Sequence, residues 1–235
     1  MLPCLAIDTC LSAVSAGLRW RDATGLEGRI SHWEHCRGGH AERLLPIVET
    51  LLAAAGLHAR DVRRIAVTLG PGTFTGVRTG IAVARAFALA SNAEVVGASS
   101  LAVMAAKLVA AREDPIATTR IAVMVDARKG QVFTQVFAAD GMATSEPELL
   151  TLADAAARLT GGVWQIGGSA ATPVATAAGA LGVQIVATHP SLEPDAANLL
   201  DMAARLAPLA RVMPIYIRPP DALPQAGKSL PRATT

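Results

Sequence analysis

Two aspartates with similar surroundings are the first residues in this chain that could do chemistry. Asp8 ends the apolar run "LAID" and Asp126 ends "AVMVD", and an alternating segment follows each of them six residues later, at Val14 and Val132. Two carboxylates at strand ends that face one cleft could hold Mg²⁺ for nucleotide hydrolysis. The simpler interpretation is that each aspartate starts a turn and accepts N–H bonds from its own loop. We favour the turn, because turn aspartates are common and the loop after Asp8 has no glycine to bring backbone close to a phosphate.

The stretch "TLGPGTFTGVRTG", residues 68–80, offers a second possible phosphate site. A P-loop needs a lysine after the glycine-rich turn, and this stretch has none. A dinucleotide site is better placed, since Gly70, Gly72 and Gly76 lie between an expected strand and an expected helix. The acid that should follow the next strand is missing, however, and the proline in the turn removes a backbone N–H. The sequence therefore gives only weak nucleotide-binding candidates, which are Asp8, Thr9, Gly70 and Gly72.

Other polar groups favour no catalytic or metal site. His32 and His35 are an odd number of residues apart, so on a strand they point to opposite faces and cannot share a metal with Cys36. No serine lies in the G-x-S-x-G pattern of a hydrolase elbow. Arg128 and Lys129 could contact RNA or a partner, although a charged hairpin turn is usually solvated. We predict no catalytic residue and no metal ligand in this chain.

The element pattern predicts an α/β protein with two related lobes. Three short segments before residue 36 form an antiparallel meander, and residues 40–55 and 76–91 have helical spacing on either side of the buried strand "RIAVTL". The equal spacing after Asp8 and Asp126 is a weak internal repeat, which indicates a second lobe built like the first, with mixed sheets. We expect an N-terminal lobe over 1–105, a C-terminal lobe over 106–218 and a flexible Pro-rich tail over 219–235.

Composition limits the classes of protein that this chain can be. With 51% hydrophobic and 17% charged residues, it has ample material for a core. A formal net charge of +2 gives no strong electrostatic footprint for a nucleic acid. Three cysteines fit neither a closed disulfide set nor a zinc signature, and neither a signal peptide nor an apolar spanning run stands out, so we expect a cytoplasmic protein without membrane contact.

The two helices of the first half carry more apolar surface than one face needs. In 76–91, small residues recur every fourth position from Gly76, while Val77 and Ile81 lie on other faces and only a narrow strip around Arg78 and Arg85 is polar. The helix over 40–55 likewise has two adjoining apolar stripes. Both helices could simply pack on one another inside the lobe, or a second protein could cover the surplus.

The quoted stretches, with "HAERLLPIVETLLAAAG" before them, "VDARKGQVF" after them and "PIYIRPP" near the end, closely resemble the TsaB (YeaZ) family. This resemblance implies a two-lobed actin-like (ASKHA, RNase H-like) ATPase fold. It also implies a role in forming N6-threonylcarbamoyladenosine in tRNAs that read codons beginning with A. In that system a larger paralogue, TsaD, binds the metal and the activated threonylcarbamoyl group, and the ATPase TsaE joins the pair. ATP and the metal ion would thus be used through partner subunits, which would also make most of the tRNA contact.

The chain departs from the catalytic paralogue where the metal should be bound. The paralogue has a histidine pair at the start of the helix after the strand matching "EVVGA", and this chain has Ser99 and Ser100 there. A scaffold that binds TsaD fits this difference, while an actin-like ATPase acting alone remains the alternative. The resemblance places the partner contact on the two helices, and the isolated protein could homodimerise through them. Our candidate interface residues are Leu45, Val48, Leu52, Val77, Arg78, Ile81 and Arg85, although periodicity leaves open which stripe faces out.

Overall fold

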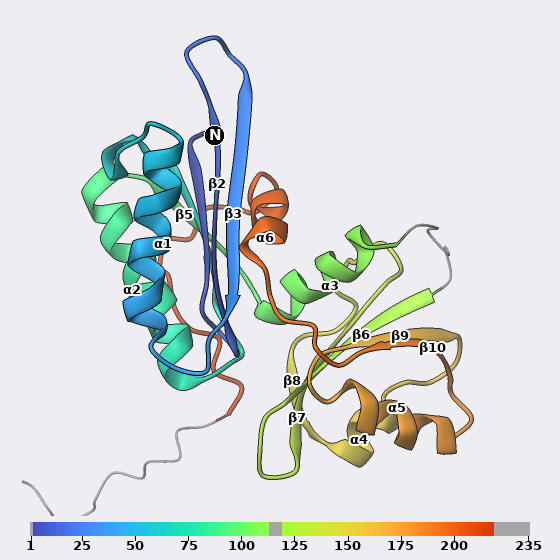
Figure 1. Cartoon of the computed structure of the whole chain (residues 1–235). Coiled ribbons are helices and arrows are strands. Elements are labelled where there is room, and N and C mark those ends of the chain that lie inside the picture. Colours follow the sequence, from blue (N-terminus) through green and yellow to red (C-terminus); the bar gives the residue numbers. More distant parts are fainter. Residues whose placement is uncertain (1, 113–118, 219–235) are drawn as a thin grey trace, which may run out of the picture.

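The computed structural model describes residues 2–112 and 119–218, and the tail expected over 219–235 lies outside the described residues. Two five-stranded mixed sheets form two lobes, each carrying its own helices (Figure 1). This confirms the predicted two-lobed α/β class. Within the described parts of the chain, no helix combines the length and the apolar character that crossing a bilayer requires.

The first sheet has the strand order β3-β2-β1-β4-β5. The predicted meander is confirmed: β1 to β3 pair antiparallel, and β1, β4 and β5 then run parallel. Helices α1 and α2 cover one face of this sheet. The elements of this part of the chain are β1 (Cys4–Asp8), β2 (Ala13–Arg21), β3 (Glu27–His35), α1 (His40–Ala54), the 3₁₀ turn η1 (Ala59–Asp61), β4 (Arg64–Thr68), α2 (Phe74–Ser91), β5 (Glu94–Ala98) and α3 (Ser100–Ala110).

The second sheet repeats the first, since its order β8-β7-β6-β9-β10 matches β3-β2-β1-β4-β5 strand for strand. The predicted internal repeat is therefore confirmed. The two turns differ by one residue, because Asp8 is paired with Ser15 whereas Asp126 is paired with Val132. The third strand, β8, was not anticipated, because four residues are too few to show alternation. The elements are β6 (Thr119–Asp126), β7 (Gln131–Phe137), β8 (Glu148–Thr151), α4 (Leu152–Ala157), β9 (Val163–Gly167), α5 (Ala171–Ala180), β10 (Gln184–His189) and α6 (Ala196–Ala203).

The helix boundaries follow from local chemistry. Thr73 caps α2 by accepting a hydrogen bond from Gly76 N at 3.1 Å, so this helix begins two residues earlier than predicted. Pro46 lies inside α1, and α1 ends at Ala54, shortly before Gly56, whose φ is +66°. Helix ends of this kind can be predicted from sequence, because capping depends only on residues that are close together in the chain.

The predicted lobe boundary at residue 105 lies in the helix α3, which contacts both sheets. Val103 of this helix packs with the first sheet while Leu108 packs with the second. The helix α6 lies beyond the second sheet in sequence but returns to cover the first one, with Leu199 and Leu200 buried against β1 and its neighbours. The core of the first lobe therefore includes a helix from the far end of the sequence.

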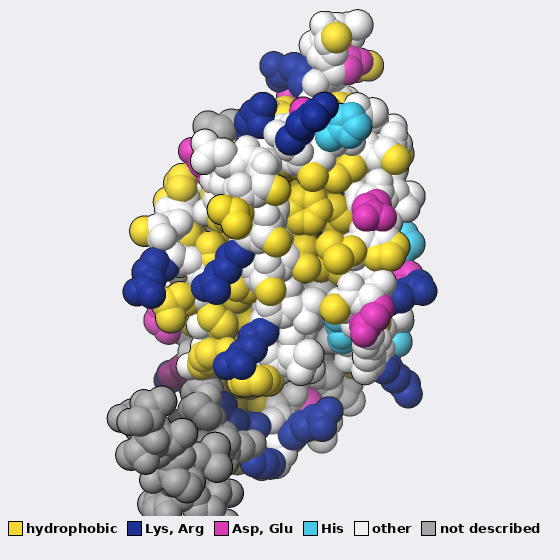
Figure 2. All heavy atoms as spheres, turned by 90° about the vertical axis from the view of Figure 1, so that its left-hand side faces the viewer, with side chains coloured by type: hydrophobic (Ala, Val, Ile, Leu, Met, Phe, Trp, Pro, Cys, Tyr) yellow, Lys and Arg dark blue, Asp and Glu magenta, His cyan; other side chains and the backbone are white. Residues whose placement is uncertain are grey.

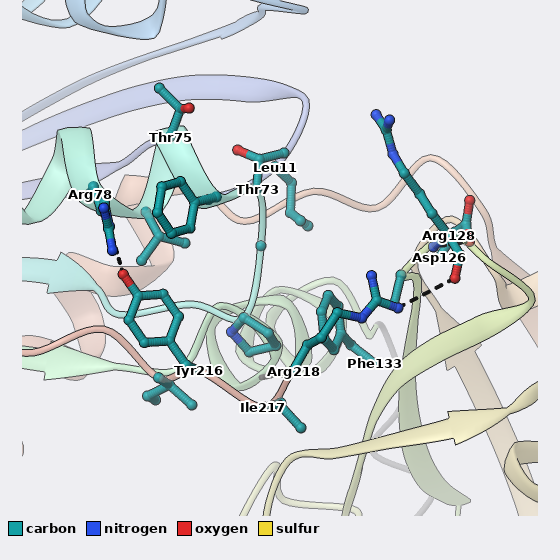
Figure 3. A pocket seen from close by; sticks show the side chains of 16 residues that line it. Leu11, Thr73, Thr75, Arg78, Asp126, Arg128, Phe133, Tyr216, Ile217 and Arg218 are labelled. Atoms are coloured by element: carbon teal, nitrogen blue, oxygen red, sulfur yellow. Dashed lines mark hydrogen bonds between the residues drawn. The ribbon is translucent and has the colours of Figure 1, made fainter. Parts of the chain in front are cut away.

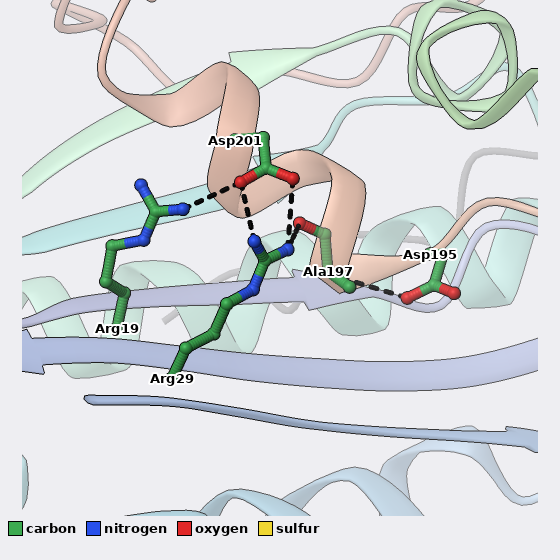
Figure 4. A network of polar contacts seen from close by, with 5 residues as sticks. All are labelled: Arg19, Arg29, Asp195, Ala197 and Asp201. Carbon is green, nitrogen blue, oxygen red and sulfur yellow. Dashed lines mark hydrogen bonds and ion pairs between the residues drawn. The ribbon is translucent and has the colours of Figure 1, made fainter. Parts of the chain in front are cut away.

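A polar clasp holds α6 on β2 and β3 (Figure 4). Asp201 accepts hydrogen bonds from Arg19 at 2.7 Å and from Arg29 at 2.8 and 3.0 Å, and Arg29 also donates to the carbonyl of Ala197 at 2.6 Å. Beneath the clasp, the Cδ1 of Leu200 lies where a side chain on Gly17 would be, 2.8 Å from an ideal Cβ. The glycine therefore allows the helix to approach the strand closely.

We predict that the apolar contact contributes more than the clasp. Leu200→Ala should lower the free energy of unfolding by about 3 kcal/mol, since a fully buried leucine is replaced by a cavity. Asp201→Asn should lower it by only about 1 kcal/mol, since both ion pairs are partly exposed. Urea unfolding of the two variants measures both values, and a larger loss in Asp201→Asn would contradict this ranking.

Candidate functional site

The glycines of residues 70–80 bring α2 onto the turn between β1 and β2. A Cβ on Gly72 would lie 2.2 Å from the carbonyl oxygen of Cys10, and one on Gly76 would lie 2.1 Å from that of Thr9. Thr73 N donates to the same Cys10 oxygen at 2.8 Å. These distances leave no space for any larger residue. The glycines therefore allow the backbone at the start of α2 to lie close to the backbone of the β1–β2 turn.

The weak nucleotide-binding candidates are engaged within the chain. The hydroxyl of Thr9 donates to Gly76 O at 2.6 Å, and the carboxylate of Asp8 accepts from the Thr68 hydroxyl at 2.5 Å. Asp8 and Thr9 are both buried. Gly70 has a φ of +96°, a conformation that glycine adopts readily, and packs near Val77. Asp8 also accepts from Cys10 N at 3.4 Å, which is the kind of contact within its own loop that the turn interpretation predicts.

Burial sets the protonation of Asp8. Its second carboxyl oxygen, Oδ2, is buried without a hydrogen-bond partner, and desolvation raises the pKa of Asp8 from 3.8 to about 6 against the opposing effect of the Thr68 hydroxyl. Glu193, on the connection from β10 to α6, accepts from Ser12 N at 3.2 Å, and burial raises its pKa from 4.5 to about 7. Each carboxyl is thus more easily neutralised than an exposed acid.

A cavity of about 700 Å³ opens beside α2 between the two lobes (Figure 3). Its walls come from the first turn of α2, from the β6–β7 turn and from the chain after α6. Asp126 and Arg128 line it, whereas Asp8, Thr9 and Gly70 do not. Arg78 and Arg218 complete its charged lining, and Phe74, Phe133 and Tyr216 add aromatic surface. The two aspartates that the sequence suggested as a pair therefore differ: Asp126 borders open space, and Asp8 is enclosed.

His32 and His40 form hydrogen bonds within the chain. His32 pairs with Glu34 at 3.1 Å and His40 bonds the carbonyl of Leu11 at 3.0 Å. Across the described ranges, no group of three or more His, Cys, Asp and Glu side chains is arranged to hold a metal ion. Arg128 and Lys129 occupy the β6–β7 turn with φ of 62° and 55°, which gives this turn its sharp reversal.

The structure corrects part of the candidate interface. Val48, Leu52, Val77 and Ile81 are buried in the core of the first lobe, between α1, α2 and the sheet. The sequence reasoning failed here because bulky residues mark the face that packs on the lobe's own sheet, and periodicity does not say which apolar arc that is. Leu45, Arg78 and Arg85 are exposed, so only these three candidates lie on the outer face of the helices.

The outer face of α1 and α2 nevertheless exposes apolar surface. Leu45 is 45% exposed, Phe74 58% and Leu89 89%. Figure 2 views the side of the molecule that carries these helices, and hydrophobic side chains gather there with Lys and Arg side chains among them. Small residues such as Ala82 and Ala86 lie between the larger ones. An exposed apolar face of this kind is typical of a protein contact.

Sequence reasoning missed the segment that follows α6, residues 209–218, which we call the strap. It runs along the first lobe, where Leu209 N donates to Val95 O at 2.8 Å and Ile215 N to Leu69 O at 2.7 Å. It ends at the second lobe, where Arg218 donates to the Gln131 side chain at 2.6 Å. The Pro-containing "PIYIRPP" carried no helix or strand pattern, so nothing local could predict this path.

The duplicated strand order and the interlobe cavity define a two-lobed α/β protein of the actin-like class. Comparison with known proteins makes this specific. A family model described as TsaD, tRNA N6-adenosine threonylcarbamoyltransferase, matches residues 34–162. The chain belongs to this family, and within it to the TsaB (YeaZ) group, in agreement with the resemblance of its sequence.

The relatives support that assignment over different lengths. The TsaB protein of Escherichia coli, described as a tRNA threonylcarbamoyladenosine biosynthesis protein, is 39% identical over 55% of this chain and 52% of its own length. The match thus spans about half of that relative. An uncharacterized protein of Mycobacterium tuberculosis is 33% identical over 94% of both chains. The structure of YeaZ from Pseudomonas aeruginosa is 29% identical with a TM-score of 0.74, covering 92% of this chain and 100% of that one.

We predict a pH-dependent stability difference at Asp8. Because folding raises its pKa, the Asp8 contribution to stability is complete below about pH 4 and is lost as the pH rises through about 6. Asp8→Asn has no such loss, so the free energy of unfolding of this variant, relative to that of the parent protein, should rise by about 3 kcal/mol between low pH and pH 8. Urea unfolding between pH 4 and 8 tests this, and a difference that does not change with pH would show that Asp8 is not held in this way.

The close approach of α2 gives a second prediction. Gly76→Ala should destabilise the protein by about 2 to 3 kcal/mol, because the new methyl group meets a backbone oxygen that cannot move aside. Gly38→Ala is the matched control, since no atom lies within 4 Å of its ideal Cβ, and it should change stability by less than about 0.5 kcal/mol. Thermal unfolding of both variants measures the effect, and equal melting temperatures would argue against the contact.

Proposed function

We propose that this protein is the non-catalytic subunit that binds a TsaD-type paralogue in the synthesis of N6-threonylcarbamoyladenosine in tRNA. In this role it acts in the cytoplasm, with a TsaE-type ATPase joining the pair and with ATP, metal and most of the tRNA bound by the partners. Membership of the TsaB family supports the pathway. The observation that carries the binding role is the exposed apolar face of α1 and α2.

The chemistry of that face fits a helical partner. Leu45 and Leu89 expose large apolar side chains, and alanines between the larger side chains of α2 let another helix approach closely. Burying such a face against a paralogue with a similar pair of helices would form a bundle across two subunits. A self-complementary version of the same contact would let the isolated protein form a homodimer.

A nucleotide-binding ATPase acting alone stays the second candidate. Asp8 and Thr9 are enclosed, which weakens it, but the cavity beside α2 has three arginines and Asp126 in its walls. Isothermal titration of the isolated protein with Mg-ATP distinguishes the two functions. Turnover by this chain alone would favour the ATPase.

The binding role predicts the effect of charges on the outer face. Leu45→Glu and Leu89→Glu should abolish co-elution with the TsaD-type protein of the same genome, because each places a charge in the apolar contact. The melting temperature should stay within a few degrees, since both side chains are exposed in the free protein. Leu181→Glu, 63% exposed on the other lobe, is the matched control and should leave co-elution unchanged. Val77 and Ile81 are unsuitable for this test, because a charge at either buried position would unfold the lobe.

Activity provides the second measurement. The rate of threonylcarbamoyl transfer to tRNA is measured with the reconstituted complex. When the Leu89→Glu variant replaces the parent protein, this rate should fall to that of a control reaction from which this chain is omitted. Full transfer by the partners in the absence of this chain would contradict the proposed role. So would unchanged co-elution of both glutamate variants.

A further inference from the structure

The strap is a fixed element of the first lobe. Its inward side chains join the core, with Val212 buried and Leu209 and Ile215 packed on the same cluster. Its backbone is held by the bonds to Val95 and Leu69, and Arg85 of α2 donates to the carbonyl of Val212. Its outward side chains, Met213 and Tyr216, are 56% and 51% exposed. The strap thus presents large side chains to solvent from an anchored backbone.

Tyr216 extends the outer face of α2 through a stack with Phe74 and Arg78. The guanidinium of Arg78 lies 3.6 Å from the ring centroid of Phe74 and 5.7 Å from that of Tyr216. The Nε of Arg78 donates to the Tyr216 hydroxyl at 2.7 Å (Figure 3), and the rings of Phe74 and Tyr216 stack with centroids 6.2 Å apart and planes 21° apart. Phe74, Arg78 and Tyr216 therefore hold one another in a defined arrangement before any partner binds.

We propose that this stack is an anchor point of the partner interface, so that the TsaD-type protein contacts the strap as well as α1 and α2. The inference rests on the proposed function. Continuity argues for the same occupant, because Phe74 and Arg78 belong to the exposed face of α2, Arg78 donates to the Tyr216 hydroxyl, and the Phe74 ring stacks with the Tyr216 ring. The residue types also fit, since tyrosine and arginine are enriched among the few residues that carry most of the binding energy in interfaces. Pre-arranged side chains lose little freedom on binding. The strap lies outside residues 34–162, the part that the family model matches.

The test is the affinity of the parent protein and its variants for the TsaD-type protein, measured by isothermal titration together with the melting temperature. Tyr216→Ala and Phe74→Ala should each weaken binding at least about tenfold. The melting temperature should change by no more than a few degrees, since both rings are more than half exposed. Met142→Ala, which removes an exposed apolar side chain from the other lobe, is the control and should bind like the parent protein.

A double-mutant cycle separates a stack that acts as a unit from independent contacts. Arg78→Ala combined with Tyr216→Ala should weaken binding by less than the product of the single effects, because either substitution already disrupts the arrangement. If Tyr216→Ala lowers the melting temperature strongly, Tyr216→Phe is used in place of Tyr216→Ala. This variant keeps the ring, loses only the bond from Arg78, and should weaken binding a few-fold.

The outcomes distinguish the two proposals. Failure of the parent protein to bind the TsaD-type protein would overturn the proposed function. Binding that is lost in Leu89→Glu but unchanged in Tyr216→Ala, Tyr216→Phe and Phe74→Ala would overturn the role of the strap and leave the proposed function standing. A stack that alters only self-association of this chain in sedimentation experiments would also overturn it, because the occupant would be a second copy.

Discussion

The contact on which the rest of this structure depends is the one between the first turn of α2 and the turn after β1. Two glycines there meet the carbonyl oxygens of Cys10 and Thr9 at distances that exclude any side chain. This contact sets how closely α2 lies on the sheet, with Gly80 and Ala84 continuing the approach along the helix. In the same region Asp8 and Thr9 are buried, and the Thr9 hydroxyl is engaged by Gly76 O of α2.

The outer surface follows from the same contact. Once the small residues and Val77 and Ile81 of α2 face inward, the remaining arc must carry Phe74, Ala82 and Leu89 outward. A helix of eighteen residues cannot bury all of these on one sheet. The apolar outer face is thus a geometric consequence of how the inner face is packed.

Much of the fold could be predicted from the sequence, because its signals were local. Alternating apolar and polar residues predicted the antiparallel meander, and helical spacing of apolar residues predicted α1 and α2. The equal spacing after Asp8 and Asp126 predicted the internal repeat. The side of each helix that faces out could not be predicted, because an apolar arc looks the same whether a sheet or a partner covers it. The return of α6 and the path of the strap were also inaccessible, since they depend on contacts more than a hundred residues away in sequence, such as that between Arg29 and Asp201.

The two lobes share a topology but differ in the helices laid on it. The first carries α1 and α2, of 15 and 18 residues, where the second carries α4 and α5, of 6 and 10 residues. Short helices cover a five-stranded sheet without surplus, as α5 does with Ala171, Val174 and Ala178 buried. Long helices on an equally wide sheet must extend apolar residues past what the sheet can cover, and the strap shelters only part of that surplus. Within the described residues, helix length thus exceeds the need of the lobe's own core in the first lobe, and the exposed apolar helix face lies on that lobe.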